Sequence, residues 1–271
     1  MGSLTNYAEN WILNHQFATA QTAPGTVYLA LCTADPGEAA TGASMSEVPN
    51  AGGYARVAIS FGAAASRRVT QSALVSFAQS SAGWGTLTHW AIVDSATYGA
   101  GNALAYGEIE PDKIVVTNNT PSVASAAIYV EISAGSLGSM TTYNAHKALD
   151  HLFRNQAFTQ PATYVGLTTT VSADATPGTE VSGGAYARVL VNKASGASPA
   201  WNTPSGDATD NANTITFATP SASWGTVVSS GLWDASTSGN QLWYMNDTPD
   251  QAIASGDPVS FPAGSLDVSL A

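Results

Sequence analysis

The chain carries the same series of short sequences twice, in the same order. The repeated sequences are YARV at 54–57 and 186–189, WGT at 84–86 and 224–226, and AGSL at 134–137 and 263–266. The offset between the copies drifts from 129 to 140 positions, which short insertions explain and a rearrangement does not. This is a tandem duplication. The shared residues are mostly of the kind that shapes a fold, so the pattern favours a packing or display role over catalysis.

A chain of 271 residues fits two domains of ordinary size, in agreement with the duplication. We place the first repeat at 1–138 and the second at 139–271, because the boundary falls directly after the last strand expected in the first copy. The linker is too short for independent tumbling, so we expect the two copies to pack together as a pseudo-dimer.

The charge composition excludes one large class of partners. Only 10% of the residues are charged, against about 25% in a typical protein. The formal net charge is −11, and the eight basic residues are divided equally between the repeats. Phosphate backbones are bound by clusters of Lys and Arg, so we expect no nucleic-acid binding. A surface of small neutral residues suits contact with other proteins or with sugars.

The single cysteine and the apolar segments place further limits. Cys32 is the only cysteine, so no internal disulfide can form, and we expect it to be a small buried residue of a strand. The N-terminus does not resemble a secretory signal, and no apolar run approaches the roughly 20 residues that span a bilayer. We therefore expect a soluble protein that folds in the cytosol where it is made, with no membrane partner.

Each repeat is expected to begin with an amphipathic helix. Apolar residues recur at helical spacing from Leu4 to Ile12, with Thr5 or Asn6 available as a cap, and from Ala145 to Phe153 after the capping candidates Thr141 and Thr142. The β-branched runs 26–31 and 163–167 follow, each after a proline.

The rest of each repeat predicts an antiparallel β-sandwich or barrel, because short apolar segments alternate with turn residues. The segments expected as strands are 54–61, 74–78, 86–93, 102–109, 113–116, 126–133, 186–192, 214–218, 226–233, 240–246, 257–261 and 266–270. Segments 33–53, 168–185 and 194–213 are rich in Ser, Thr, Gly and Ala, so we expect long loops there.

Two matched arginines are the first candidate site residues. Arg56 and Arg188 each lie in a predicted strand beside a tyrosine. We expect a structural role, with the guanidinium paired to a carboxylate of the same copy. Asp94 and Asp234 occupy matching positions at strand ends and are the natural partners, although an Asp at such a position also caps turns.

The tryptophans divide into matched and unmatched positions. Trp84 and Trp224 are matched and predict core or rim residues. Trp201, Trp233 and Trp243 are partly unmatched, and we take them as candidates for exposed contact with a partner, including a glycan.

No pattern typical of an enzyme is found. The histidines lack metal-ligand spacing, and nucleophile-elbow, phosphate-loop and dinucleotide motifs are missing. Glu108 and Glu110 would share one face of a strand, but we expect no aromatic cleft beside them to raise either pKa. We therefore predict no enzymatic activity, no catalytic residue, no cofactor and no metal site.

Several of these sequences together resemble a family of bacteriophage virion structural proteins. They are the Asn6-Tyr7 helix opening, PATYVGL at 161–167, EVSGGAYAR at 180–188, SWGT at 223–226, Asp234-Ala235-Ser236, and AGSL at 263–266. Members are described as tail-fibre-like, and similar β-rich modules serve as capsid decoration, or cement, proteins. The resemblance covers both halves, and the second is the closer match.

The resemblance implies a non-enzymatic component of the outer surface of a virion. The first expectation is a capsid decoration protein that binds the lattice of the major capsid protein and stabilises the head. The alternative is a tail or tail-fibre component with a receptor-binding or glycan-binding role. In either case other virion proteins, and a further copy of the chain, are the expected partners.

Overall fold

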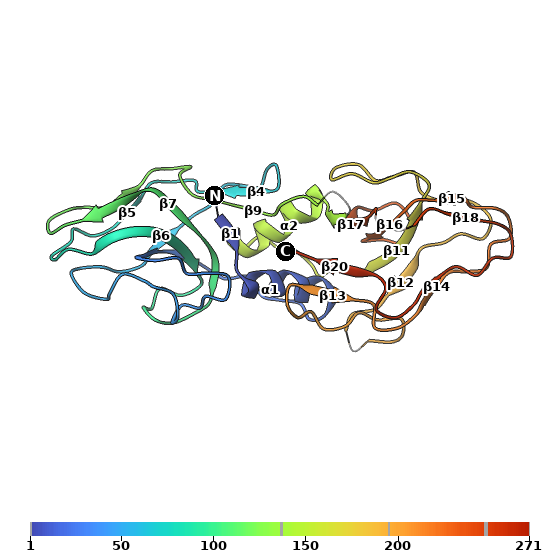
Figure 1. Ribbon diagram of the computed structural model, residues 1–271, viewed down its shortest axis with the longest axis horizontal. Helices are drawn as coiled ribbons and strands as arrows, with labels where there is room; N and C mark the ends of the chain where they lie inside the picture. The colour runs from blue at the N-terminus through green and yellow to red at the C-terminus, as the bar shows by residue number, and fades with distance from the viewer. Residues whose placement is uncertain (1, 136–137, 195, 247–248, 271) are drawn as a thin grey trace. The chain divides into compact units, whose positions relative to one another are not determined.

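The computed structural model describes residues 2–135, 138–194, 196–246 and 249–270, which form two compact units (Figure 1). Unit 1 contains the chain up to Glu9, Thr22–Ile132 and His146–Phe158. Unit 2 contains Asn10–Gln21, Ser133–Ala145 and the chain from Thr159. The units therefore interleave the sequence repeats, because each unit takes most of the β-structure of one repeat and a helical segment of the other.

Two helices are present in the described part of the chain, α1 (Asn6–Phe17) and α2 (Thr142–Arg154). Thr5 and Thr141 are the N-caps, since each hydroxyl accepts the backbone N–H three residues later at 3.3 Å. Each hydroxyl also donates to a strand carbonyl, that of Ala103 or Gln241, at 2.6 Å. These contacts fix the start of each helix against its sheet. The two expected helices and their threonine caps are confirmed, but Leu4, which the spacing predicts on the first helix, ends strand β1 (Gly2–Leu4), and Tyr7 is exposed rather than on the buried face.

The buried helix faces explain the composition of the units. In α2 the predicted apolar positions are buried, including Ala145, Leu149 and Phe153, and the polar residues Asn144 and His151 are buried as well. The ring of Phe153 packs against Phe61 in unit 1, with centroids 5.4 Å apart. The C-terminal end of α1 belongs to unit 2, where Phe17 packs 4.7 Å from Trp201. Neither helix is long and apolar enough to cross a membrane.

Unit 1 is built on a seven-stranded sheet in the order β3-β2-β6-β7-β1-β9-β4. All neighbouring pairs are antiparallel except β1 and β9. Strands β5 and β8 form a separate antiparallel pair, and β5 contacts β3 of the sheet. The strands are β1 (Gly2–Leu4), β2 (Val27–Cys32), β3 (Val57–Ile59), β4 (Arg68–Thr70), β5 (Val75–Ser76), β6 (Gly85–Val93), β7 (Ala103–Val115), β8 (Ser122–Val123) and β9 (Tyr129–Glu131).

Unit 2 has a five-stranded antiparallel sheet, β10-β17-β16-β11-β12, and three two-stranded pairs, β13–β20, β14–β19 and β15–β18. The strands are β10 (Gly138–Met140), β11 (Thr163–Thr168), β12 (Val189–Val191), β13 (Ala208–Asp210), β14 (Ile215–Thr216), β15 (Gly225–Val227), β16 (Ser229–Trp233), β17 (Gln241–Met245), β18 (Gln251–Ile253), β19 (Ser260–Phe261) and β20 (Asp267–Ser269). The expected mainly β, largely antiparallel architecture is confirmed.

Several strand boundaries differ from the sequence expectation. The predicted strands 102–109 and 113–116 form one strand, β7, with a bulge: His89 is opposite Glu108, whereas Leu87 is opposite Lys113. The predicted strand 226–233 is divided into β15 and β16. The predicted loop 194–213 contains β13, which pairs with the C-terminal strand β20.

Candidate binding site

Arg56 lies at the centre of a buried polar cluster in unit 1. Its Nε and Nη2 donate to the two carboxylate oxygens of Glu47 at 2.9 and 2.8 Å. The hydroxyl of Tyr54 donates to the same carboxylate at 2.7 Å and accepts the N–H of Leu31 at 3.0 Å. The side chains of Arg56 and Glu47 are 0% and 3% exposed. The cluster therefore joins a loop carboxylate to strand β2 through fully enclosed hydrogen bonds.

Arg56 holds the loop that follows β6 through its Nη1, and its Nη2 also donates to the carbonyl of Gly42 at 2.8 Å. Its Nη1 donates to the carbonyls of Ser95, Thr97 and Ala100 at 2.8–2.9 Å. Asp94 closes the same loop by accepting the backbone N–H and the side-chain amide of Asn102, at 2.7 and 2.8 Å. The arginine thus stabilises the backbone of this loop.

Unit 2 repeats the cluster with the same atoms. Arg188 donates to both oxygens of Glu180 at 2.7 Å, and Tyr186 donates to Glu180 at 3.0 Å. Asp234 accepts the backbone N–H of Asn240 at 2.7 Å. The surroundings differ, because the Arg188 guanidinium lies 4.4 Å from the ring centre of Trp233, and Glu180 is 31% exposed.

A triad of aromatic rings supports each cluster. Tyr54 stacks on Phe77 and meets the edge of Trp84. The corresponding rings in unit 2, at 186, 217 and 224, show the same stacked and edge-on geometry. Burial, together with the carboxylate of Glu47, raises the pKa of Tyr54 above its ordinary value, so the phenol stays a hydrogen-bond donor.

The sequence prediction that Asp94 and Asp234 pair with these arginines is therefore wrong. Arg56 pairs with Glu47 and Arg188 with Glu180, whereas Asp94 and Asp234 cap the loops that these arginines hold. A sequence signal for the true partners exists, because Glu-Val occurs at 47–48 and again at 180–181. The expected structural role of the two arginines agrees with this geometry.

The three tryptophans expected at an exposed surface are buried. Trp201 is 1% exposed, and Trp233 and Trp243 are each 2% exposed. Trp201 donates to the hydroxyl of Thr163 at 2.9 Å, and Trp243 donates to Gln16 Oε1 at 2.8 Å. These side chains have interior packing roles, so the sequence expectation of exposed contact is wrong for them.

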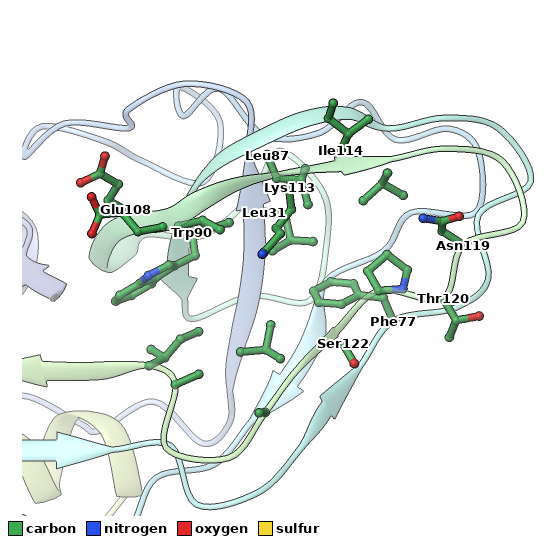
Figure 2. Close-up of a pocket in the computed structure, with 18 residues that line it drawn as sticks. Leu31, Phe77, Leu87, Trp90, Glu108, Lys113, Ile114, Asn119, Thr120 and Ser122 are labelled. Atoms are coloured by element: carbon green, nitrogen blue, oxygen red, sulfur yellow. The ribbon is translucent and has the colours of Figure 1, made fainter.

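A cavity of about 620 Å³ opens within unit 1, between the β6–β7 hairpin and the segment that carries β8 (Figure 2). We call it the β6–β7 pocket. Buried apolar side chains form much of its wall: Leu31, Phe77, Leu87, Trp90, Val115 and Ile128. Its volume lies within the range of about 300–1,000 Å³ that is typical of small-ligand sites.

Polar side chains also line this pocket. Glu108, Glu110 and Lys113 come from the bulged part of β7, and Asn119, Thr120 and Ser122 come from the segment leading into β8. Figure 2 shows the amino group of Lys113 directed into the cavity. The expectation that Glu108 and Glu110 have no aromatic cleft beside them is wrong, because Trp90 and Phe77 line the same pocket.

The pocket offers binding groups without a recognisable catalytic arrangement. Among the residues that the structure describes, no group of three or more His, Cys, Asp and Glu side chains is placed to hold a metal ion. Cys32 is buried, and burial raises the pKa of its thiol to about 12, so it is not a nucleophile at neutral pH.

Comparison with known proteins gives one family. The family described as "Podophage GP4 fiber I protein gp80" matches the chain twice, at residues 3–131 and 139–269. No curated protein matches the chain. The two matched segments lie within the two sequence repeats, so each repeat is one copy of the family module.

Proposed function

The chain belongs to the Podophage GP4 fiber I protein gp80 family, and we propose that it is a non-enzymatic structural component of a podophage virion, assembled into a fibre. The observation that carries the proposal is the double match, which covers almost the whole chain with a module described as a fibre protein. The matched residues include both arginine clusters and both aromatic triads, whose contacts stabilise the fold.

The distribution of polar interactions supports a structural role. The buried ion pair of Arg56 with Glu47 serves to hold a loop. Tyr54 and Cys32 are buried groups whose pKa values are raised, which keeps both in the protonated state at neutral pH. A catalytic site instead requires a nucleophile or base that is activated near neutral pH.

A fibre component has to join neighbouring virion proteins, so its partners are proposed to be other structural proteins of the particle. Tandem modules suit this task because two similar surfaces on one chain can each contact a subunit of a symmetric assembly. Placement on the major capsid protein lattice, as a decoration protein, is the competing outcome.

The placement is tested by labelling purified virions with gold-conjugated antibody raised against the full chain. We expect the label on fibres that project from the particle, with no label after the antibody is absorbed with purified protein. Label spread over the faces of the head would replace the fibre assignment with capsid decoration. Unlabelled particles, where an antibody to a known virion protein labels normally, would refute both placements.

A further inference from the structure

The second repeat provides an internal reference for the β6–β7 pocket. In unit 1 Leu87 is opposite Lys113 and Val75 is opposite Val123. The equivalent pairs in unit 2 are Val227 with Gln251 and Ile215 with Phe261. The strand pairings of the two units therefore have the same register. Each described pocket residue on these strands can be matched to one residue of unit 2 without an insertion or a deletion between them.

This register shows that the pocket walls differ between the repeats. Val123 lines the pocket in unit 1, whereas the larger Phe261 takes the equivalent position in unit 2 and packs 6.3 Å from Phe217. Phe77, which is the equivalent of Phe217, lines the pocket. An aromatic ring therefore packs in unit 2 at the position where unit 1 has a smaller side chain facing open space.

Two of the three charged side chains of the pocket, Lys113 and Glu108, have neutral counterparts in unit 2, and the counterpart of Glu110 lies outside the described residues. Lys113 in unit 1 corresponds to Gln251 in unit 2. Glu108 directly follows Gly107, which is opposite Trp90, and Asn246 directly follows Met245, which is opposite the equivalent residue Ser230. Glu108 therefore corresponds to Asn246. The same module folds with neutral side chains at these positions in unit 2. The fold therefore does not require a charge at either of these two positions.

The charged side chains of the pocket are available to a ligand. Arg56, Arg68, Arg154 and Arg188 form ion pairs, and Arg67 and Lys193 donate to backbone carbonyls. Lys113, Glu108 and Glu110 have no ion pair or side-chain hydrogen bond within the residues that the structure describes. The ammonium of Lys113 thus enters an apolar cavity without a partner of its own. Glu108 and Glu110 are exposed carboxylates at the rim of this cavity, and Figure 2 shows the Glu108 carboxylate beyond Trp90, directed away from Leu31 and Phe77.

The chemistry of the lining selects a class of ligand. Two carboxylates against one ammonium, in a chain of net charge −11, disfavour anionic ligands. Hydroxyl groups satisfy both kinds of lining group, because a hydroxyl donates to a carboxylate and accepts from an ammonium. The C–H faces of a sugar ring match the apolar wall formed by Leu31, Leu87 and Val115.

From these observations we infer that the β6–β7 pocket of unit 1 binds an uncharged saccharide of one or two sugar units, with Lys113 inside the cavity and Glu108 and Glu110 at its rim holding the hydroxyl groups. The inference goes beyond the proposed placement, because it concerns one pocket of one unit and applies on a fibre or on a capsid. It also assigns the first repeat a task that the second does not share.

The test uses the purified full chain and saturation-transfer NMR. The probes are glucose, galactose, mannose, N-acetylglucosamine and disaccharides of these sugars, with glucuronate and a neutral dipeptide as probes of other ligand classes. We expect at least one neutral saccharide to give a transfer signal, and titration of that saccharide then gives its Kd. Glucuronate and the dipeptide should give weaker signals or none.

Variants taken from the second repeat connect the signal to the pocket. Val123→Phe places the residue of unit 2 in unit 1 and should abolish the signal. Lys113→Gln removes a charged donor and should weaken binding by about tenfold, the loss expected for one hydrogen bond to a charged group. Gln251→Ala is the matched control in unit 2 and should leave the Kd unchanged.

Thermal unfolding of each variant identifies any loss of fold. If Val123→Phe is unstable, Lys113→Gln still tests the pocket, because Lys113 is exposed and its substitution should leave the fold intact. The inference is overturned if no neutral saccharide gives a signal at millimolar concentration, or if glucuronate or the dipeptide binds more tightly. It is also overturned if a stably folded Val123→Phe variant retains the wild-type Kd. Gold labelling of virions is independent of all these outcomes, so failure here and failure of the fibre placement are distinguishable.

Discussion

Replacing Glu47 by alanine should destabilise the protein more than the same change at Glu180, although the two carboxylates make the same contacts. In unit 1 the change leaves the guanidinium of Arg56 and the hydroxyl of Tyr54 without their acceptor in a fully enclosed cluster. Removing one partner of a buried ion pair costs about 3–5 kcal/mol, because the other charge stays buried and uncompensated.

The cost should be smaller in unit 2. Glu180 is 31% exposed, so water can reach the space that its carboxylate leaves. The guanidinium of Arg188 also keeps its contact with the ring of Trp233, 4.4 Å from the ring centre. We expect a loss of about 1–2 kcal/mol, which is closer to the value of an ordinary hydrogen-bonded pair.

Differential scanning calorimetry at neutral pH measures the difference. A chain of this size loses about 2–4 °C of Tm per kcal/mol, so Glu47→Ala should lower the Tm of unit 1 by roughly 6–20 °C. Glu38→Ala, an exposed carboxylate in the same loop, is the control and should change the Tm by less than 2 °C, or about 0.5 kcal/mol. A shift for Glu47→Ala no larger than that for Glu180→Ala would refute the argument that burial sets the cost.

Three further predictions concern other buried groups. Burial lowers the pKa of Lys193 to about 8, below its value in the unfolded chain, so the unfolded chain binds more protons between pH 8 and 10. The free energy of unfolding in urea should therefore rise by about 1–3 kcal/mol over this range, relative to a Lys193→Met variant. An equal pH profile for the two proteins would contradict this. Burial raises the pKa of the Cys32 thiol to about 12, so Ellman's reagent at pH 8 should react with it only after denaturation, and rapid reaction of the native protein would show that the thiol is accessible. Gln16→Leu removes the acceptor of the Trp243 indole N–H, which is 2.8 Å away, and should cost about 1–3 kcal/mol in urea unfolding, whereas a neutral effect would mean that the indole finds another acceptor.

The features that the sequence predicts well are those that depend on local periodicity. The helix faces from Ala8 and from Ala145 follow a spacing that only a helix can bury on one side, and both caps are threonines at the expected places. The long strand β6 is rich in residues that fit a pleated sheet. The duplication added independent support, because each of these elements occurs twice.

The features that were missed depend on partners far away in the chain. Strands such as β1 and β10 begin with Gly-Ser, and only their pairing with β7 and β17 makes them strands. The partner of Arg56 is nine positions away in a loop, so neither strand position nor spacing marks it. Its only signal is the Glu-Val dipeptide that occurs again at 180–181.

The tryptophans and the pocket show a different limit of sequence reasoning. Lack of a match between repeats predicts exposure for Trp201 and Trp243, but both pack around Phe17 of α1. Their burial follows from the way the units interleave the repeats, which no local pattern encodes. The β6–β7 pocket is likewise assembled from residues between Leu31 and Ile128 that are widely separated in the chain.

The measurement that tests the central claim most directly is the copy number of this protein in purified virions, from quantitative densitometry against the major capsid protein. A fibre component predicts a small number of copies, a multiple of three or six set by the symmetry of the tail. Hundreds of copies in a simple ratio to the capsid protein, or none at all, would contradict the account.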